Sequence, residues 1–278
     1  MAGLPDGAAV LREWTSAAGA WRKWRREFAL QSRVATELLL EAARVEPGMR
    51  ILDLASGSGE PAVSLAMAAG PEGRVIATDI VPAMLLGARE HAAERGGGNV
   101  AVAAANSEAL PFPAGTFDRL TCRFGAMFFP AIEQAIEEAR RVLRPEGRAV
   151  FLAWGEARHN TFFTATTGVL LKHAPPAQQT SDLAHRFAHP GSLSAALHGL
   201  EQVTEAFHSI VWPWPGTPEG FWDYSVEVRR SFRRIFESLS PAERQQAKQE
   251  SLAEMQRFYD GRQVNFGAQI VIASGVRA

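Results

Sequence analysis

The chain has 278 residues, 46% of them hydrophobic, and a formal net charge of −1. This length allows one large domain, or one domain with a substantial insertion, and the composition is sufficient for a full hydrophobic core. The near-neutral balance gives no electrostatic basis for nucleic-acid binding, which normally needs a clustered basic surface. The one cysteine, Cys122, excludes a disulfide within the chain and a thiolate metal cluster. No apolar stretch approaches about 18 residues and no signal-peptide pattern is present, so we expect a cytoplasmic protein without membrane contact or bound metal.

Helical and extended patterns alternate along most of the chain. Residues 8–45 have a helical pattern with an apolar stripe that includes Trp14, Trp21 and Trp24. Beyond it we expect strands at 50–54, 74–78, 99–104, 117–124, 147–154, 202–212 and 263–276, and helices at 61–69, 82–95, 130–143 and 191–200. Strands that alternate with helices predict an α/β fold with a doubly wound, mostly parallel sheet.

The expected elements divide the chain into segments. These are an N-terminal helical cap (1–48), a nucleotide-binding core (49–155), a cap segment with the sixth strand (156–216), a helical cap insertion (217–258) and the last core strand (259–278). Thr217 is a suitable N-cap for one helix of the insertion, and Ser240 with Glu243 forms a capping box for another. Phe221 and Trp222 can line the inner face of this insertion. The insertion is either a lid over a bound molecule or ordinary packing of helices on the sheet edge.

The segment ILDLASGSGEPA (51–62) is a strand followed by a small-residue loop and a helix start, which is the arrangement of a nucleotide-binding corner. Its glycines also satisfy the dinucleotide pattern. Glu60, however, would repel a pyrophosphate at the helix start. Asp53, near the strand end, suits a ligand with an ammonium or sulfonium group. The charge pattern therefore favours S-adenosylmethionine (SAM), which carries both cations and no phosphate.

Residues 50–151 resemble the class I SAM-dependent methyltransferases, especially the branch that includes the ubiquinone/menaquinone-biosynthesis methyltransferases. Four blocks carry the resemblance: ILDLASGSG (51–59), VIATDIVPAM (75–84), NSEALPFPAGTFD (106–118) and RVLRPEGRAVF (141–151). The resemblance implies a seven-stranded, Rossmann-like sheet whose last strand is antiparallel. It also implies SAM as the cofactor, with S-adenosylhomocysteine as its product.

The expected cofactor site lies where the strands of this core end. Asp79 ends the second strand, where a carboxylate can accept hydrogen bonds from both ribose hydroxyls; a helix N-cap role is its alternative. Ile80 and Met84 are apolar faces for the adenine or, alternatively, core residues. By resemblance, Asn106 stands where the family often has an Asp that binds the adenine amino group. The full set expected at the cofactor is Asp53, Ala55, Ser56, Gly57, Gly59, Asp79, Ile80, Met84, Asn106, Ser107 and the backbone near Arg123 and Phe124.

The acceptor side is expected to be apolar. Relatives often carry polar residues or histidine in the turn after the fourth strand, whereas this chain has Met127 and Phe128 there. With Trp21, Phe221 and Trp222, these residues are expected to contact a small, largely apolar acceptor, aromatic or polyketide/quinone-like, that is methylated on O, N or C. His159, just beyond the fifth strand, is a candidate general base or an exposed loop residue. An NAD(P)-dependent oxidoreductase and a non-catalytic SAM-binding protein are the alternative functions.

Overall fold

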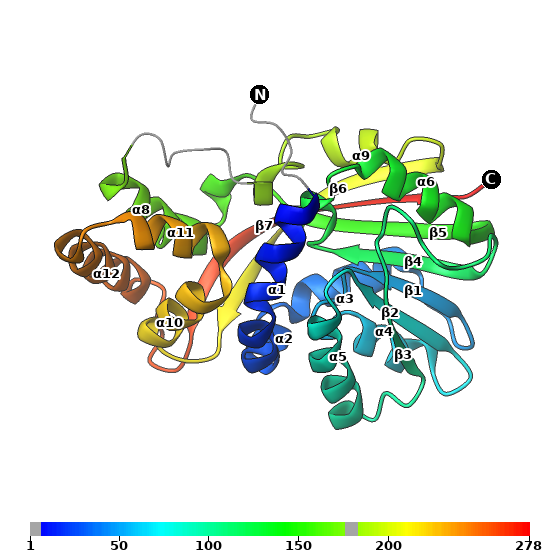
Figure 1. Cartoon of the computed structure of the whole chain (residues 1–278), viewed down its shortest axis with the longest axis horizontal. Coiled ribbons are helices and arrows are strands. Elements are labelled where there is room, and N and C mark those ends of the chain that lie inside the picture. Colours follow the sequence, from blue (N-terminus) through cyan, green and yellow to red (C-terminus); the bar gives the residue numbers. More distant parts are fainter. Residues whose placement is uncertain (1–6, 176–182) are drawn as a thin grey trace.

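The computed structural model describes residues 7–175 and 183–278, which form a seven-stranded sheet with helices on its faces (Figure 1). The strand order is β3-β2-β1-β4-β5-β7-β6. The strands are β1 (Arg50–Leu54), β2 (Arg74–Asp79), β3 (Val100–Ala104), β4 (Phe117–Arg123), β5 (Leu143–Trp154), β6 (Glu201–Trp214) and β7 (Val264–Val276). Strands β1 to β5 pair in parallel, and β7 is antiparallel to both β5 and β6. The predicted fold, including its antiparallel last strand, is confirmed.

Helices cover the faces of the sheet. These helices are α3 (Arg33–Ala43), α4 (Ala62–Ala69), α5 (Pro82–Arg95), α6 (Ile132–Val142) and, near the sheet edge, α9 (Ser192–Ala196), and α4, α5 and α6 each connect two parallel strands. In α6 the buried residues Ile132, Ala135, Ile136, Ala139 and Val142 recur at helical spacing and form one apolar face. Strand β4 is buried along its whole length, as expected for a central strand covered on both faces. The carboxyl ends of the parallel strands consequently meet at one edge of a rigid sheet.

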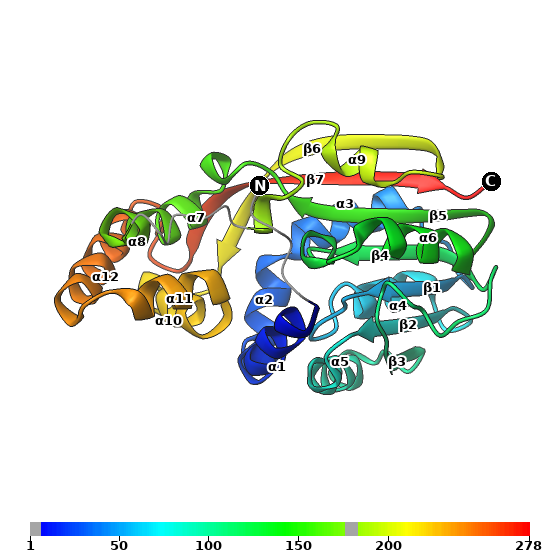
Figure 2. The same cartoon turned by 45° about the horizontal axis from the view of Figure 1, so that its top comes forward.

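The N-terminal segment is broken into separate helices with different roles. The expected helical stretch consists of α1 (Gly7–Lys23), α2 (Arg25–Gln31) and α3. Helix α3 packs against β4, β5, β6 and β7 and buries Ala35, Leu39 and Ala43, so it belongs to the core layers. Helix α1 packs instead against α5 and α10 and crosses the middle of the molecule (Figures 1 and 2). Helix α1 therefore lies apart from the helices that pack directly on the sheet.

The chain between β5 and β6, together with that between β6 and β7, builds a helical lobe beside the sheet (Figure 1). Its helices are α7 (Thr161–Thr164), α8 (Thr167–His173), α10 (Pro218–Val228), α11 (Arg230–Ser238) and α12 (Pro241–Gln256). Thr217 Oγ1 accepts a hydrogen bond from the Gly220 N–H, which caps α10. Ser240 and Glu243 bond reciprocally at the start of α12, so the predicted capping box is confirmed. Local sequence signals thus fix where these helices begin.

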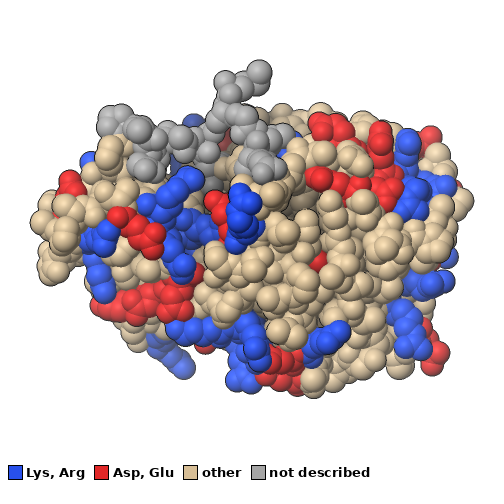
Figure 3. All heavy atoms as spheres, in the orientation of Figure 1, with Lys and Arg blue, Asp and Glu red and all other residues tan. Residues whose placement is uncertain are grey.

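The surface agrees with the balanced composition. On the face in Figure 3, basic and acidic side chains are mixed at the left and lower margins, while the centre is largely uncharged. Within residues 7–175 and 183–278, no helix has the length and apolarity that a membrane crossing requires.

Candidate cofactor and acceptor site

A pocket with a cavity volume of about 150 Å³ lies at the carboxyl ends of β1, β2 and β4. Loops that follow the strands line the pocket on one side, and helices α1 and α2 line it on the other. Its lining comprises Val10, Trp14, Trp21, Arg25, Phe28, Ala55, Ser56, Gly57, Ser58, Glu60, Asp79, Ile80, Met84, Asn106, Ser107, Glu108, Arg123, Phe124, Gly125, Phe128, Phe129 and Pro130.

Asp53 stabilises the loop that follows β1 from within the core. Its carboxylate accepts hydrogen bonds from Ser56 Oγ at 2.5 Å and Thr121 Oγ1 at 2.6 Å. Burial raises the pKa of Asp53 to about 7, although the bonds from Ser56 and Thr121 oppose that rise. The side chain is fully buried and does not line the pocket. The expectation that Asp53 faces the ligand is therefore corrected: it shapes the loop that does.

Gly59 is also a structural residue of this loop. Its φ is 110°, and a Cβ placed on it would lie 3.0 Å from the Ala88 Cα of α5. The absence of a side chain thus lets the loop pack against α5. Gly57 (φ 53°) and Ala55 (φ 50°), by contrast, line the pocket in left-handed conformations.

Asp79 links the end of β2 to this loop. One carboxylate oxygen accepts from the Gly57 N–H at 3.0 Å, and the other accepts from the Val81 N–H at 2.9 Å. Burial raises the pKa of Asp79, and the two backbone donors counteract this. A carboxylate can accept about four hydrogen bonds, so capacity remains for a ligand in the pocket that Asp79 lines.

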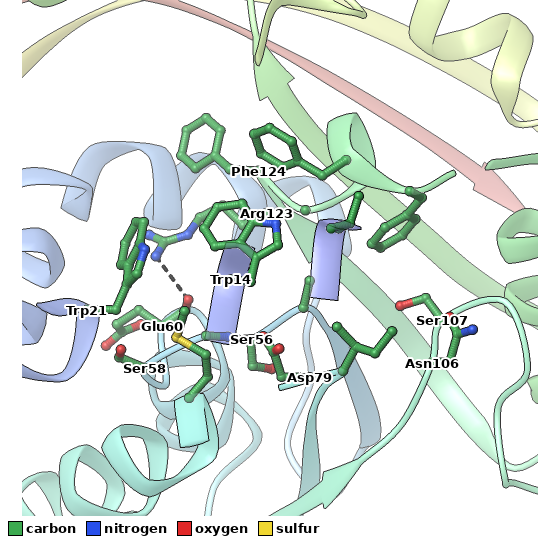
Figure 4. A pocket seen from close by; sticks show the side chains of 18 of the residues that line it. Trp14, Trp21, Ser56, Ser58, Glu60, Asp79, Asn106, Ser107, Arg123 and Phe124 are labelled. Carbon is green, nitrogen blue, oxygen red and sulfur yellow. Dashed lines mark hydrogen bonds between the residues drawn. The ribbon is translucent and has the colours of Figure 1, made fainter. Parts of the chain in front are cut away.

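Ile80 lines the pocket while remaining 40% exposed. Met84 of α5 lines it as well, in a buried cluster with Ala18 and Val81 against which Trp14 and Trp21 pack. Asn106 and Ser107 lie at the end of the pocket away from Glu60 and Arg123 (Figure 4). The Asn106 Oδ1 already accepts from the Glu108 N–H at 3.0 Å, so one of its two acceptor positions is used.

Arg123 and Glu60 lie at the opposite, polar end. The Arg123 guanidinium is 5% exposed and donates to Ser32 Oγ and Thr36 Oγ1, each at 2.6 Å, and to the Glu60 carbonyl at 2.9 Å. Burial lowers the pKa of Arg123. The sequence analysis expected only the backbone near Arg123 at the site. It did not predict that the Arg123 side chain bonds to residues of the N-terminal helical segment.

Glu60 keeps its charge despite being largely buried. Its Oε1 lies 3.1 Å from His91 Nε2. Burial by itself would raise the pKa of Glu60, but His91, Arg123 and Ser64 more than offset that effect and hold the pKa below its ordinary value. The pocket therefore contains an anion next to the buried Arg123 cation.

Aromatic rings form the wall between these ends. Trp14 packs edge-on against Phe128 with 5.1 Å between ring centroids, and Trp21 does so against Phe28 at 4.9 Å. Phe124 has a φ of 60° and stacks on Trp154 at 4.0 Å. Trp14 and Phe28 were not expected at the site. The feature of the sequence that could have indicated these two residues is the apolar stripe of the N-terminal helical segment.

Several expected site residues lie elsewhere. Met127 is buried in the core, while its neighbour Phe128 lines the pocket. Phe221 and Trp222 are buried inside the helical lobe, where Trp222 packs against Phe232 at 5.2 Å. His159 is exposed, and its Nε2 accepts from Arg158 Nε at 3.2 Å. Phe128 lines the pocket, whereas Met127, Phe221, Trp222 and His159 do not. The expected acceptor contacts of Met127, Phe221 and Trp222 and the catalytic placement of His159 are therefore corrected.

Solved structures share this architecture. The YcgJ protein from Bacillus subtilis has a TM-score of 0.53 and 20% identity, covering 88% of this chain and 98% of that one. Phosphoethanolamine N-methyltransferase 2 from Haemonchus contortus, solved in complex with SAM, has a TM-score of 0.55 and 13% identity, covering 92% of this chain and 57% of that one. The fold is that of the class I SAM-dependent methyltransferases.

Within this class the sequence identifies a family. Residues 21–170 match the ubiE/COQ5 methyltransferase family, and the chain belongs to it. The ubiquinone/menaquinone biosynthesis C-methyltransferase UbiE of Methylobacterium nodulans is 45% identical over 113 residues, which are 41% of this chain and 44% of that protein. The corresponding protein of Shewanella sediminis is 35% identical over 143 residues, 51% of this chain and 53% of that protein. The match thus spans about half the length of these relatives. The predicted family and its cofactor, SAM, are confirmed.

Proposed function

We propose that this protein transfers a methyl group from SAM to a small, largely apolar acceptor. The observation that carries the proposal is one pocket that combines the Asp79 carboxylate, the apolar side chain of Ile80 that follows it, and a polar end at Glu60 and Arg123. These features suit, in turn, the ribose, the adenine and the charged amino-acid part of SAM. A pyrophosphate would instead meet the Glu60 carboxylate, and family membership likewise argues against the NAD(P)-dependent alternative.

The aromatic wall supports an acceptor with an apolar, planar body. Trp14, Phe124, Phe128 and Phe129 all line the pocket, and Trp14 packs edge-on against Phe128. The UbiE relatives are named for ubiquinone/menaquinone biosynthesis. We infer an aromatic or quinone-like acceptor for this chain.

The residues would act mainly by positioning and by exclusion of water. Bound SAM supplies a methyl group that its sulfonium already activates for displacement. The loop 55–60 and Asp79 would fix the cofactor, while Trp14 and Phe128 cover the pocket and keep water out. Such alignment can contribute roughly 7–11 kcal/mol to lowering a reaction barrier. His159 lies outside the pocket, so we do not assign it the role of a base.

The test is product formation with methyl-labelled SAM and a panel of phenols, hydroquinones and primary amines. We expect label in at least one aromatic or hydroquinone acceptor, with S-adenosylhomocysteine formed in equal amount. Binding of SAM without transfer to any acceptor in the panel would favour the non-catalytic alternative. Absence of SAM binding would contradict the proposed function itself.

A further inference from the structure

Strand β6 forms one edge of the sheet, and no other strand of residues 7–175 and 183–278 lies beyond it (Figures 1 and 2). It is 14 residues long, whereas β3 at the opposite edge has 5 residues. A strand at an edge leaves one row of N–H and C=O groups without a partner strand, and such a row can pair with another chain. The edge at β6 therefore offers a place where a partner strand can extend the sheet.

The pairing of β6 with β7 shows which backbone groups point to the open side. The Gly267 N–H donates to Thr161 Oγ1 at 2.9 Å and the Gly267 C=O accepts from it at 3.3 Å, so both groups are directed away from β6. The residue opposite Gly267 in β6 is Val211. Two opposite residues of an antiparallel ladder either bond to each other or both direct their backbone groups away from each other. The backbone groups of Val211, and at a period of two those of Ser209 and Phe207, consequently point to the open edge.

The middle of this edge lacks the features that usually prevent strands from pairing. Exposed edges normally carry charged side chains or proline, or are interrupted by a bulge. The segment AFHSIVW (206–212) contains no lysine, arginine, carboxylate, proline or glycine. Such features lie outside the segment: the register shifts between Glu201 and Thr204, and Pro213 follows. An uncharged stretch of strand-forming residues at an open edge favours association with another strand.

We propose that two copies of this chain associate through their β6 edges, with the two strands antiparallel about a two-fold axis at Phe207. The outward N–H and C=O groups of each copy then bond to those of the other, and the two sheets become continuous. In this register Phe207 lies opposite Phe207 of the second copy, Ser209 lies opposite Glu205, and Val211 lies opposite Val203.

The edge is self-complementary, which favours a second copy as the partner. A two-fold arrangement presents the same uncharged segment from both sides, so the contact is complete without another kind of protein. An axis at Phe207 keeps Glu205 from facing its own copy, which avoids like charges directly opposite each other. It also brings together Val203 and Val211, which are 37% and 56% exposed in the single chain.

The proposed interface lies apart from the pocket. No residue of β6 lines the pocket, so a second copy bound at this edge leaves the pocket lining unchanged. The inference therefore does not rest on the proposed function, and association can be measured independently of ligand binding.

Sedimentation velocity of the full chain over a range of concentrations tests the association. We expect a reversible monomer–dimer equilibrium for the wild type. Val211→Lys places a charge on the open edge and should weaken the dimer at least about tenfold. Its matched control is Leu86→Lys, which changes a 48% exposed residue of α5, the helix that packs on β2 and β3 at the other end of the sheet. A wild type that stays monomeric at every concentration, or a dimer that Val211→Lys leaves intact, would overturn the inference.

Disulfide cross-linking then locates the axis. The native Cys122 is buried, and burial raises the pKa of its thiol, so it should not react. Opposite residues of a hydrogen-bonded antiparallel pair have Cα atoms about 5.5 Å apart, within the roughly 4.4–6.8 Å that a disulfide spans. We therefore expect Phe207→Cys to form a disulfide-linked dimer under mild oxidation, whereas Ser209→Cys, which would lie opposite Glu205, should not. Thermal melting verifies that both variants fold. Efficient cross-linking of Ser209→Cys, or none of folded Phe207→Cys, would overturn the proposed axis.

Discussion

Asp53 is a buried carboxyl group at the end of β1, directly beneath the loop that lines the pocket. Its oxygens accept from Ser56 and Thr121, and burial raises its pKa from 3.8 to about 7. The folded state thus favours the protonated form more strongly than the unfolded chain does. This contribution to stability is fully present below about pH 4 and is lost as the pH rises through about 7.

Replacement of Asp53 by Asn should flatten this dependence. The amide is neutral at every pH and nearly the same size, so it avoids the cost of a buried charge. Relative to the wild type, Asp53→Asn should gain stability between pH 5 and pH 8, by an amount on the order of a few kcal/mol at most. Urea unfolding at both pH values measures the difference. Parallel profiles for the two proteins would mean that Asp53 does not titrate in this range.

At the residue scale, the sequence predicts best the groups that lie at strand ends. The apolar runs in the sequence locate the strands, and residues just beyond a strand lie at the carboxyl edge of the sheet. Those that line the pocket as predicted include Ala55, Gly57, Asp79, Asn106 and Phe124. Trp14, Arg25 and Ser58 were missed. Their place in the pocket depends on where α1 and α2 cross the sheet, and no local pattern specifies that path.

Helix α1 is the element that closes the pocket, and ion pairs hold it on two sides. On the side of α5, Arg22 of α1 pairs with Glu90, and Arg25 and Arg26 of the adjoining α2 pair with Glu94. On the side of the helical lobe, Lys23 pairs with Glu227 at 2.7 Å, and Glu13 pairs with Arg230, whose guanidinium also lies 4.9 Å from the Trp14 ring centroid. Because Trp14 and Trp21 of α1 line the pocket, we expect movement of α1 to affect how fast a ligand enters or leaves.

Removal of the α5 partners should therefore speed ligand exchange. Glu90→Gln combined with Glu94→Gln deprives three arginines of their carboxylates without changing a pocket-lining residue. We expect S-adenosylhomocysteine to dissociate several-fold faster, as measured by stopped-flow displacement. The control is Glu37→Gln, whose pair with Arg33 lies within α3. An unchanged dissociation rate in the double variant would show that the contacts with α5 do not limit the movement of α1.

The helical insertion shows what element-level prediction can and cannot provide. Its helix starts follow from Thr217 and from the Ser240 capping box, both of which act within a few residues. The orientation of Phe221 and Trp222 depends instead on how α10 packs on neighbouring helices and strands, and both rings turn into the lobe. In place of direct acceptor contacts, the insertion braces α1 through Glu227 and Arg230.

At the scale of the whole molecule, the fold divides into a part set by local pattern and a part set by tertiary packing. The parallel strands and their helices alternate clearly in the sequence, so the core could be predicted from periodicity. The antiparallel direction of the last strand came from the family resemblance, because β6 and β7 are separated by the whole helical insertion; the position of β7 between β5 and β6 was not predicted. Helix α1 links these two parts of the fold at the pocket, because it contacts both the core and the helical lobe.

The central claim is that SAM binds in this pocket, at the carboxyl edge of the sheet. Its most direct test is calorimetric titration of S-adenosylhomocysteine and NADH into the wild type and into Asp79→Ala, with the exposed Asp223→Ala as control and melting temperatures to verify folding. Charge-assisted bonds contribute about 1.5–3 kcal/mol each, so after replacement by water the Asp79 variant should bind roughly 10–100-fold more weakly. We predict that the wild type and the control bind S-adenosylhomocysteine far more tightly than NADH. Unchanged affinity in Asp79→Ala, or preference of the wild type for NADH, would contradict the account.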